Sequence, residues 1–243
     1  MNDIQPLVSV GIPTYNRPEE IRHCLEGLAC QTYHNLEIIV SDNGTPDDLT
    51  KTVVNEFMLR DPRIKYYQQI ENKGPLFNFQ FVLDQAVGEF FMWAGDDDYR
   101  APTYIAQLVS QMQQNPESVV SFCDFFEIDE KGIKAEAYPK HLPLLLPFKS
   151  NHSFVRLIRF FLQLESKGKA NIIYGLMRRS YLKGFKWSEF KHKYGGYGID
   201  MLFVFSLLCQ GRLALTDQTL YRCTVGNAKE YVSTEKLSFI DKV

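Results

Sequence analysis

Three consecutive aspartates, Asp96, Asp97 and Asp98, are the sharpest chemical feature of this 243-residue sequence. They follow a short apolar run and Gly95, at the point where a buried strand would end. Three neighbouring negative charges cost free energy unless a cation neutralises them. A hard divalent cation with oxygen ligands would do so and would bridge to substrate phosphates. A solvated loop that caps the helix after Pro102 explains the triplet equally well, and both interpretations stay open.

Two further expected strand ends also carry polar residues, at 14–17 and at 42–44. A carboxylate such as Asp42 accepts hydrogen bonds from the hydroxyls of a ribose or the imide of a base. Taken alone, Asp42-Asn43-Gly44 is most often only a turn. In open parallel sheets, ligands bind outside the carboxyl ends of the strands. We therefore expect the three polar segments to lie together at one edge of a sheet.

The first half of the sequence alternates strand and helix patterns. Strands are expected at 7–12, 36–40, 64–67, 89–94 and 118–122, with helices at 18–29, 49–58, 75–87 and 103–114. The helix at 49–58 is expected to turn Leu49, Val53, Phe57 and Met58 inward. This rhythm predicts an α/β fold with right-handed crossovers, in which helices flank both faces of a mostly parallel central sheet.

The rhythm breaks after residue 122. We expect a hairpin turn at 129–132, an apolar loop at 142–147, a helix at 152–165, a strand at 172–177 and a helix at 199–210. A glycine-rich loop at 195–198 precedes the last helix and could serve as a movable lid. Because there is no internal repeat or low-complexity linker, residues 1–243 are predicted to form a single domain.

Composition excludes several classes of protein. The chain has 27 Lys and Arg against 29 Asp and Glu, a net charge of −2, so no basic field recruits nucleic acid. No apolar run reaches the roughly 18 residues of a spanning helix, and the first residues lack a secretory profile. The five cysteines show no C-x-x-C pair, which argues against a disulfide framework or a zinc site. We expect a cytoplasmic enzyme, with contact at the inner face of the membrane left open.

Four segments resemble, in the right order, the motifs of the family 2 glycosyltransferases with the GT-A fold. Segment 8–17, VSVGIPTYNR, looks like the opening motif, and segment 37–45, EIIVSDNGT, looks like the second. Segments 72–78 and 86–90 are similar to the stretch that leads into the D-x-D motif of the family. The resemblance covers the first 125 residues well and the rest more loosely, and it suggests a bacterial polysaccharide or O-antigen type of acceptor.

The resemblance assigns roles position by position. The implied donor-binding residues are Pro13, Tyr15, Asn16, Arg17, Asp42, Lys73, Asn78, Asp96 and Asp97, and the implied ligands of Mg²⁺ or Mn²⁺ are Asp96, Asp97 and Asp98. Arg17 would lie near the pyrophosphate, and Asp42 would recognise the base or its ribose. Asp96 and Asp98 would form the D-x-D pair. A gapless count from Gly88 instead places the metal-binding aspartate of the family at Asp97, so all three remain candidates.

Asp200 is the candidate general base. Family members often carry an acidic pair before a helix that ends in glycine, and 198–211 resembles this pattern with Ile199 in place of the usual glutamate. A base at this position would accept the proton of the acceptor hydroxyl while that oxygen attacks the anomeric carbon, which inverts the centre. Without the family, Asp200 is equally well a helix cap or a first-turn acid.

The expected protein is thus a metal-dependent, inverting glycosyltransferase that uses a nucleotide-diphosphate sugar. Residues 1–125 would bind the donor, and residues 126–243 would bind a glycan or lipid-linked acceptor. Two alternatives remain: a nucleotidyltransferase that uses the same acidic cluster, and a non-catalytic nucleotide-sugar-binding module. An apolar stripe in the helix at 152–165 is either packed on the sheet or forms a surface that meets a lipid-linked acceptor at the membrane. Its residues are Phe154, Leu157, Ile158, Phe161 and Leu162.

Overall fold

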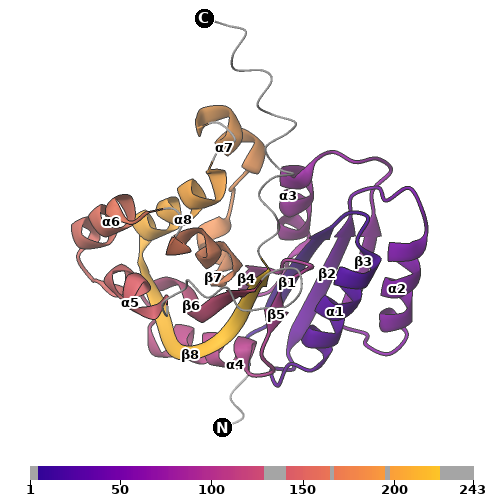
Figure 1. Ribbon diagram of the computed structural model, residues 1–243, viewed down its shortest axis with the longest axis horizontal. Coiled ribbons are helices and arrows are strands. Elements are labelled where there is room, and N and C mark those ends of the chain that lie inside the picture. The colour runs from indigo at the N-terminus through magenta and orange to yellow at the C-terminus, as the bar shows by residue number, and fades with distance from the viewer. Residues whose placement is uncertain (1–4, 129–140, 165–166, 195–197, 225–243) are drawn as a thin grey trace, which may run out of the picture.

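The computed structural model describes residues 5–128, 141–164, 167–194 and 198–224, and it contains an eight-stranded sheet with the order β3-β2-β1-β4-β7-β6-β8-β5 (Figure 1). The strands are β1 (Val8–Thr14), β2 (Leu36–Asp42), β3 (Ile64–Gln68), β4 (Phe90–Trp93), β5 (Tyr99–Arg100), β6 (Ser118–Ile128), β7 (Leu176–Arg178) and β8 (Arg212–Thr224). The α-helices are α1 (Pro18–Ala29), α2 (Leu49–Met58), α3 (Pro75–Gln85), α4 (Tyr104–Gln114), α5 (Leu142–Leu145), α6 (Ser153–Leu162), α7 (Trp187–Tyr194) and α8 (Ile199–Gln210). Three 3-10 helices join them: η1 (Leu146–Lys149), η3 (Lys169–Tyr174) and η4 (Arg179–Leu182).

The first four strands form the parallel part of the sheet. β1 pairs in parallel with both β2 and β4, and β2 pairs in parallel with β3. All seven residues of β2 and six of the seven in β1 are buried. Strands that are buried on both faces require cover on both sides of the sheet. The helices between these strands supply it, as the alternating pattern predicts.

The amphipathic pattern of the sequence explains α1. Pro18 occupies the first turn, where its missing N–H costs nothing, and two glutamates of that turn favour the helix dipole. The apolar residues recur at helical spacing, and all of them but the last, the exposed Ala29, lie on the buried face: Ile21, Cys24, Leu25 and Leu28. Since α1 begins only three residues after β1 ends, this short connection fixes the position of the polar residues between them.

The remaining strands extend the sheet beyond β4, and of these only β7 and β5 run opposite to the first four strands. β7 lies antiparallel between β4 and β6, and β8 pairs in parallel with β6. The end of β8 also pairs antiparallel with the short β5, where Tyr99 lies opposite Arg222. Because β5 directly follows the three aspartates, the last residues of β8 lie beside them.

An aromatic cluster joins the two ends of the chain. The Trp93 ring from β4 lies 5.8 Å from Trp187 and 5.4 Å from Phe203 in α8. Phe185 packs edge-on against Trp187 at 4.9 Å between ring centroids. Contacts of this kind between residues nearly 100 positions apart bury apolar area shared by both halves of the chain.

Several local predictions are wrong. Residues 169–174 form η3 rather than a strand, and only Leu176–Arg178 pairs in the sheet. A short buried β-branched run such as Ile172–Ile173 looks the same in a strand and in a buried helical turn. The predicted loop at 142–147 forms α5 and the start of η1, with a proline in the first turn of each. On α2, Leu49 is 59% exposed and Met58 39% exposed, so only part of the expected face is buried.

Two strands of the structure were not predicted, and two predicted segments fall outside the described residues. β5 and the thirteen-residue β8 were not anticipated from the sequence pattern. The expected hairpin turn at 129–132 lies outside the described residues, as does 195–197, most of the expected lid. Within the ranges described, no helix combines the length and hydropathy that a membrane crossing demands.

Candidate active site

The structure brings the three predicted polar segments together at the carboxyl ends of β1, β2 and β4. β1 and β2 run in register to their last pair, Thr14 and Asp42. The Thr14 hydroxyl donates a 2.7 Å hydrogen bond to Asp96, and the Asn16 amide donates to the Thr45 hydroxyl at 2.8 Å. Residues that are distant in sequence therefore share one edge, as expected for ligand sites in open parallel sheets.

Asp42 is fully buried and its carboxylate is engaged within the protein. Its Oδ1 accepts hydrogen bonds from the amide and the hydroxyl of Thr45, and its Oδ2 accepts one from the Tyr66 hydroxyl at 2.9 Å. These bonds order the turn after β2, where Thr45 in turn holds the Asn16 amide. Because Asp42 has no exposed surface, direct contact with a nucleotide would require its surroundings to move.

The remaining predicted donor residues divide into exposed and buried groups. Tyr15 is 40% exposed, and Lys73 is exposed with its ammonium 5.0 Å from the Phe77 ring centre. Pro13 is partly buried beside them. Asn78 is buried, and its amide nitrogen donates to the carbonyls of Thr14 and Ser41, which ties β1 to β2.

Each aspartate of the triplet has a different environment. Asp96 is 7% exposed and bonds to Thr14 and Arg17. Asp98 is 9% exposed, accepts hydrogen bonds from the Tyr221 hydroxyl and the Thr224 amide, and lies 3.7 Å from the buried Arg100 guanidinium. The Asp97 side chain is 35% exposed. It is thus the most accessible carboxylate of the three.

Burial and charge set the proton affinities of this cluster. Burial raises the pKa of Asp96 to about 6, although the Thr14 hydroxyl and Arg17 oppose the rise. Burial likewise raises the pKa of Asp98, and the nearby charge of Asp97 adds to both shifts. Burial works against the charge of Arg17, but Asp96 and Asp97 outweigh it and hold the pKa of Arg17 above its ordinary value. Arg17 therefore remains charged.

Arg17 forms ion pairs with two of the three carboxylates of the triplet. Its Nη1 lies 3.1 Å from an Asp96 oxygen and 2.9 Å from Asp97 Oδ2. Behind the cluster, buried Arg100 donates to the carbonyls of Gly95 and Asp98 at 3.4 Å and lies over the Tyr221 ring. Gly95 is required beside it, because a Cβ there would lie 2.4 Å from Asp98 Oδ2.

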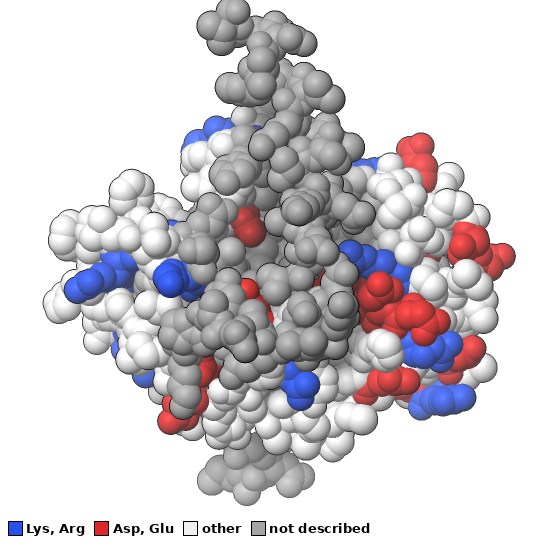
Figure 2. All heavy atoms as spheres, viewed as in Figure 1, with Lys and Arg blue, Asp and Glu red and all other residues white. Residues whose placement is uncertain are grey.

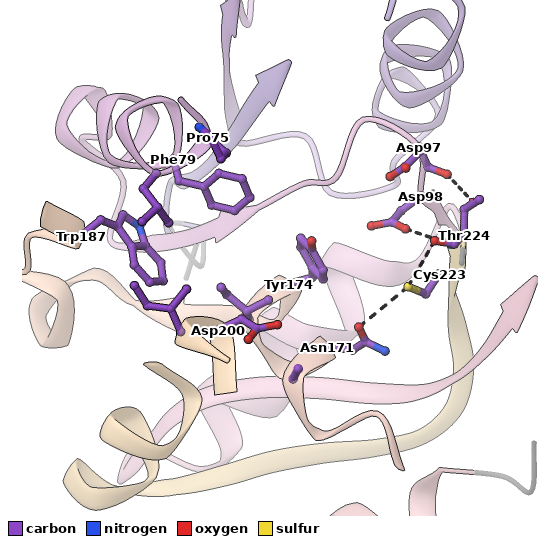
Figure 3. Close-up of a pocket in the computed structure, with 14 residues that line it drawn as sticks. Pro75, Phe79, Asp97, Asp98, Asn171, Tyr174, Trp187, Asp200, Cys223 and Thr224 are labelled. Atoms are coloured by element: carbon purple, nitrogen blue, oxygen red, sulfur yellow. Dashed lines mark hydrogen bonds between the residues drawn. The ribbon is translucent and has the colours of Figure 1, made fainter. Parts of the chain in front are cut away.

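A pocket of 290 Å³ opens beside the triplet. It is lined by Pro75, Leu76, Phe79, Asp97, Asp98, Ala170, Asn171, Ile173, Tyr174, Trp187, Ile199, Asp200, Cys223 and Thr224. Figure 3 shows Asp97 and Asp98 with Thr224 on one wall and Asp200 on another, next to Tyr174. The structure thus brings Asp200 and two of the three aspartates into one cavity.

Asp200 lies in the first turn of α8, one residue inside its start. The preceding Gly198 adopts φ 61°, so the helix begins with a left-handed residue at its N-cap. Asp200 Oδ1 accepts a 2.8 Å hydrogen bond from the Met201 amide. Across the ranges that the structure covers, no cationic side chain forms an ion pair with Asp200. Its second oxygen is therefore available to a ligand in the pocket.

Sequence reasoning missed much of the pocket wall. Asn171 and Tyr174 come from η3, and Cys223 and Thr224 come from the end of β8. Among the wall residues that were missed, only Trp187 could have drawn attention, because the sequence has only two tryptophans. These residues follow no motif, because they reach the site through the return of β7 and β8 to the sheet.

The residues fit a cation that is shared with a ligand. Wherever the chain is described, no three His, Cys, Asp or Glu side chains group so as to hold a metal ion. Two carboxylates, Asp97 and Asp98, nevertheless face the pocket. Mg²⁺ is commonly bound by one or two carboxylates together with substrate phosphates and waters. The site therefore suits this kind of shared coordination rather than an all-protein cage.

Comparison with known proteins places this geometry in a family. The model of a family described as "Glycosyl transferase family 2" matches residues 9–184. This chain belongs to glycosyltransferase family 2. Among curated relatives, a GalNAc(5)-diNAcBac-PP-undecaprenol beta-1,3-glucosyltransferase of Campylobacter jejuni is 36% identical over 119 residues, which are 49% of this chain and 38% of that protein. Glycosyltransferase GlyG of Streptococcus pneumoniae is 32% identical over 125 residues, 51% of this chain and 40% of that one.

Solved structures confirm the GT-A fold of this family 2 member. S. aureus TarS matches with a TM-score of 0.67 and 22% identity over 90% of this chain and 36% of TarS. The mannosyltransferase PcManGT of Pyrobaculum calidifontis matches with a TM-score of 0.58 and 16% identity over 92% of this chain and 57% of PcManGT. At these identities the likeness concerns the fold. The curated relatives and TarS extend well beyond the part that this chain matches.

Proposed function

We propose that this chain transfers a sugar from a nucleotide-diphosphate donor to a hydroxyl of a glycan or lipid-linked acceptor, with inversion at the anomeric carbon. Residues 1–125 would bind the donor, and residues 126–243 would supply the acceptor side and the base. A divalent cation, Mg²⁺ or Mn²⁺, would share the donor phosphates with the acidic triplet.

The observation that supports this proposal is the arrangement of carboxylates around one cavity. Asp97 and Asp98 lie on one wall, and Asp200 lies on another, within a pocket of 290 Å³ (Figure 3). Glycosyl transfer needs a charged group near the departing diphosphate and a proton acceptor near the incoming hydroxyl. The two groups must be separated by the sugar, and this pocket separates them.

The donor residues would act in two ways. Pro13, Tyr15, Asn16 and Lys73 form the accessible rim, whereas Asp42 and Asn78 are buried and order the strand ends beneath it. Arg17 already lies beside Asp97, where a diphosphate would accept its hydrogen bonds.

Within the triplet, the accessible Asp97 is the metal ligand that we favour. Asp98 would be the second, and Asp96 would position Arg17 and Thr14. The cation would offset charge that develops on the leaving diphosphate.

Asp200 would accept the proton of the acceptor hydroxyl. The acceptor oxygen would attack the anomeric carbon from the face opposite the diphosphate, and the bond from that carbon to the diphosphate oxygen would break. One displacement at one carbon inverts its configuration. Phe79, Tyr174 and Trp187 give the pocket apolar walls, against which a pyranose ring can pack.

Relatives support the substrate classes without naming the sugar. TarS has been solved with UDP and with UDP-GlcNAc, and PcManGT with GDP-Man and Mn²⁺. The Campylobacter relative is named for an acceptor linked to undecaprenol through a diphosphate. We propose by analogy a lipid-linked glycan acceptor and a site of action at the cytoplasmic face of a membrane.

Ligand-dependent thermal unfolding tests the donor site. The chain would be unfolded with UDP, GDP, UDP-sugars and GDP-sugars, each with and without Mn²⁺. A ligand at 100 times its Kd stabilises the folded state by about 2.7 kcal/mol, roughly 5–10 °C in Tm for a chain of this size. We expect one nucleotide to produce a shift of this kind that depends on Mn²⁺.

Two variants sharpen the experiment. Asp97→Asn should abolish the Mn²⁺ dependence of the nucleotide-induced shift in Tm. Asp217→Asn removes the same charge at an exposed position on β8, and it should preserve that dependence. A shift that is indifferent to the metal would contradict the cation site. No shift with any nucleotide would contradict the proposed function.

A further inference from the structure

The outer face of α6 exposes an unusual amount of apolar surface. Phe154 is 76% exposed, Phe161 78% and Leu162 67%. Val155 and Ile158 are each 37% exposed on the same helix. With two neighbours, these residues form what we name the α6 surface: Leu146, Phe154, Val155, Ile158, Phe161, Leu162 and Leu164.

The side of α6 that faces the protein is a different one. Phe160 is 5% exposed and packs on Phe148 and Phe205 at 5.6 Å between ring centroids. Arg156 is 5% exposed and donates from Nε to the Leu208 carbonyl and from Nη1 to the Ser150 carbonyl. Of the predicted stripe, Phe154, Ile158, Phe161 and Leu162 therefore face outward, whereas Leu157 is partly buried against the core.

The charged side chains within residues 142–164 are all basic, and Glu165 directly follows them in the sequence. From Leu142 to Leu164 the sequence contains Lys149, Arg156 and Arg159 and no Asp or Glu. Lys149 and Arg159 are exposed. Where Figure 1 places α6, at the left of the view, Figure 2 shows a visible surface that is white and blue. Apolar side chains beside cations match a surface with an apolar interior and anionic groups.

α6 contacts α8, the helix that carries the candidate base Asp200. It packs against α8 through Phe160–Phe205 and Arg156–Leu208. Asp200 lies five and eight residues before these contacts on the same helix. At about 1.5 Å per residue, the base is roughly 8–12 Å along α8 from the contacts with α6. The α6 surface lies on the opposite side of α6, so a lipid held there would be about one helix diameter, roughly 10 Å, farther from Asp200.

We propose that the α6 surface docks this protein on an anionic lipid membrane. The apolar face of α6 would enter the boundary between headgroups and acyl chains, and Lys149 and Arg159 would contact the headgroup phosphates. The inference rests on the proposed function for its purpose, which is to bring the pocket to an acceptor that is anchored in lipid. The docking itself follows from exposure and charge.

Vesicle co-sedimentation tests the docking. We expect the full chain to bind phosphatidylglycerol vesicles and to bind phosphatidylcholine vesicles much less, with binding that weakens as salt is added. The double variant Phe154→Ser/Phe161→Ser should lower partitioning by about 100-fold, or about tenfold for each phenylalanine. Lys149→Glu/Arg159→Glu should remove the preference for the anionic lipid.

The matched control is Leu59→Ser/Ile70→Ser, which removes two side chains that are 89% and 102% exposed outside the α6 surface. It should leave vesicle binding unchanged. Because Phe154 and Phe161 are themselves exposed, their variants should keep the wild-type Tm and the nucleotide-dependent shift.

Three results would overturn the proposal: no binding of the wild type, equal binding of the double variant, or a wild-type dimer that the double variant dissociates. Failure of vesicle binding with an intact nucleotide shift would refute the docking alone. The reverse pattern would refute the proposed function.

Discussion

Asp97 and Asp200 are chemically alike, but their surroundings differ, and we propose different roles for them. Asp97 lies beside a guanidinium and two other carboxylates, in a setting that attracts cations. Asp200 stands alone at the start of a helix, with an apolar wall around it. Its place in the pocket would let it contact an acceptor hydroxyl, which is the contact that a general base needs.

Replacing this base by an amide gives the first prediction. Asp200→Asn should lower kcat by about 10²–10⁴-fold, because the amide cannot accept the hydroxyl proton. Donor binding, measured as the nucleotide-dependent shift in Tm, should stay unchanged.

A merely structural Asp200 would behave differently. Loss of a first-turn acid costs about 0.3–1 kcal/mol of stability and leaves turnover intact. Unchanged kcat in Asp200→Asn, with the control Asp217→Asn also unchanged, would remove Asp200 from the mechanism.

Arg17 gives a second prediction, because it occupies the position beside Asp97 that a divalent cation would approach. Arg17→Met should weaken binding of the nucleotide diphosphate by about 10–100-fold, since a charged hydrogen bond contributes roughly 1.5–3 kcal/mol. The same variant should bind Mn²⁺ more tightly in the absence of nucleotide, because a competing cation is gone. Titration of Mn²⁺ and nucleotide separately measures both effects.

The control for Arg17, which precedes α1 as its N-cap residue, is Arg22 inside that helix. Arg22 pairs with Glu56 at 2.9 Å on the outside of α1. Arg22→Met should leave both affinities as in the wild type. Weaker Mn²⁺ binding in Arg17→Met would show that Arg17 supports the cation rather than competing with it.

At the scale of elements, the sequence indicated that the ends of β1, β2 and β4 share one edge of the sheet. It did not indicate where β7 and β8 would pair. Thr14, Asp42 and Asp96 each directly follow or end an apolar run, so their shared edge follows from parallel pairing alone. Thr224 reaches Asp98 only because β8 crosses to pair with β5, a contact of 126 positions in sequence. No local pattern in β8 specifies its partner, since strand pairing depends on the whole sheet.

Helices α1 and α6 differ in how well the apolar pattern of the sequence indicates the buried side. On α1 the apolar residues at helical spacing lie on the buried face, except for the exposed Ala29 at the end of the stripe. On α6 apolar residues surround the helix, and the buried positions include Arg156, whose guanidinium caps carbonyls of the neighbouring turn and of α8. The apolar stripe therefore did not identify the side of contact.

Glu37 gives the element-scale prediction, because it ties β2 to β1 and to the turn before β4. It is 5% exposed and accepts hydrogen bonds from the Ser9 hydroxyl, the Val87 and Gly88 amides and Lys65. Burial works to raise its pKa, but these donors outweigh burial and lower it. Glu37→Gln should cost about 1.5–3 kcal/mol in the free energy of unfolding at pH 7.

The pH dependence has a defined sign. With a folded-state pKa below the unfolded value of 4.5, the charged form of Glu37 stabilises the fold above that pH. The difference between wild type and Glu37→Gln should therefore shrink as pH falls through the lowered folded-state pKa. Urea unfolding at pH 7, 4 and 3 measures it. Glu56→Gln, which breaks an exposed pair, should cost less than about 1 kcal/mol at every pH.

The whole molecule is held together across the boundary that separates the two proposed halves. β4 of the first half pairs with β7 of the second, and β5 pairs with β8. The pocket follows the same boundary, since Asp97 comes from one side and Asp200 from the other. A site built in this way is intact only while the halves remain packed.

Trp93 lies at the centre of that packing and gives the last prediction. It is fully buried, contacts Trp187 and Phe203 from the second half, and donates from its indole nitrogen to the Phe79 carbonyl at 3.0 Å. Trp93→Ala should cost about 3–5 kcal/mol, which lowers Tm by roughly 6–20 °C, and unfolding should remain a single transition. Phe154→Ala, at an exposed aromatic, should shift Tm by no more than about 2 °C. Two separate transitions, with only one moved by Trp93→Ala, would mean that the halves fold independently and that the pocket between them is a contact rather than a shared core.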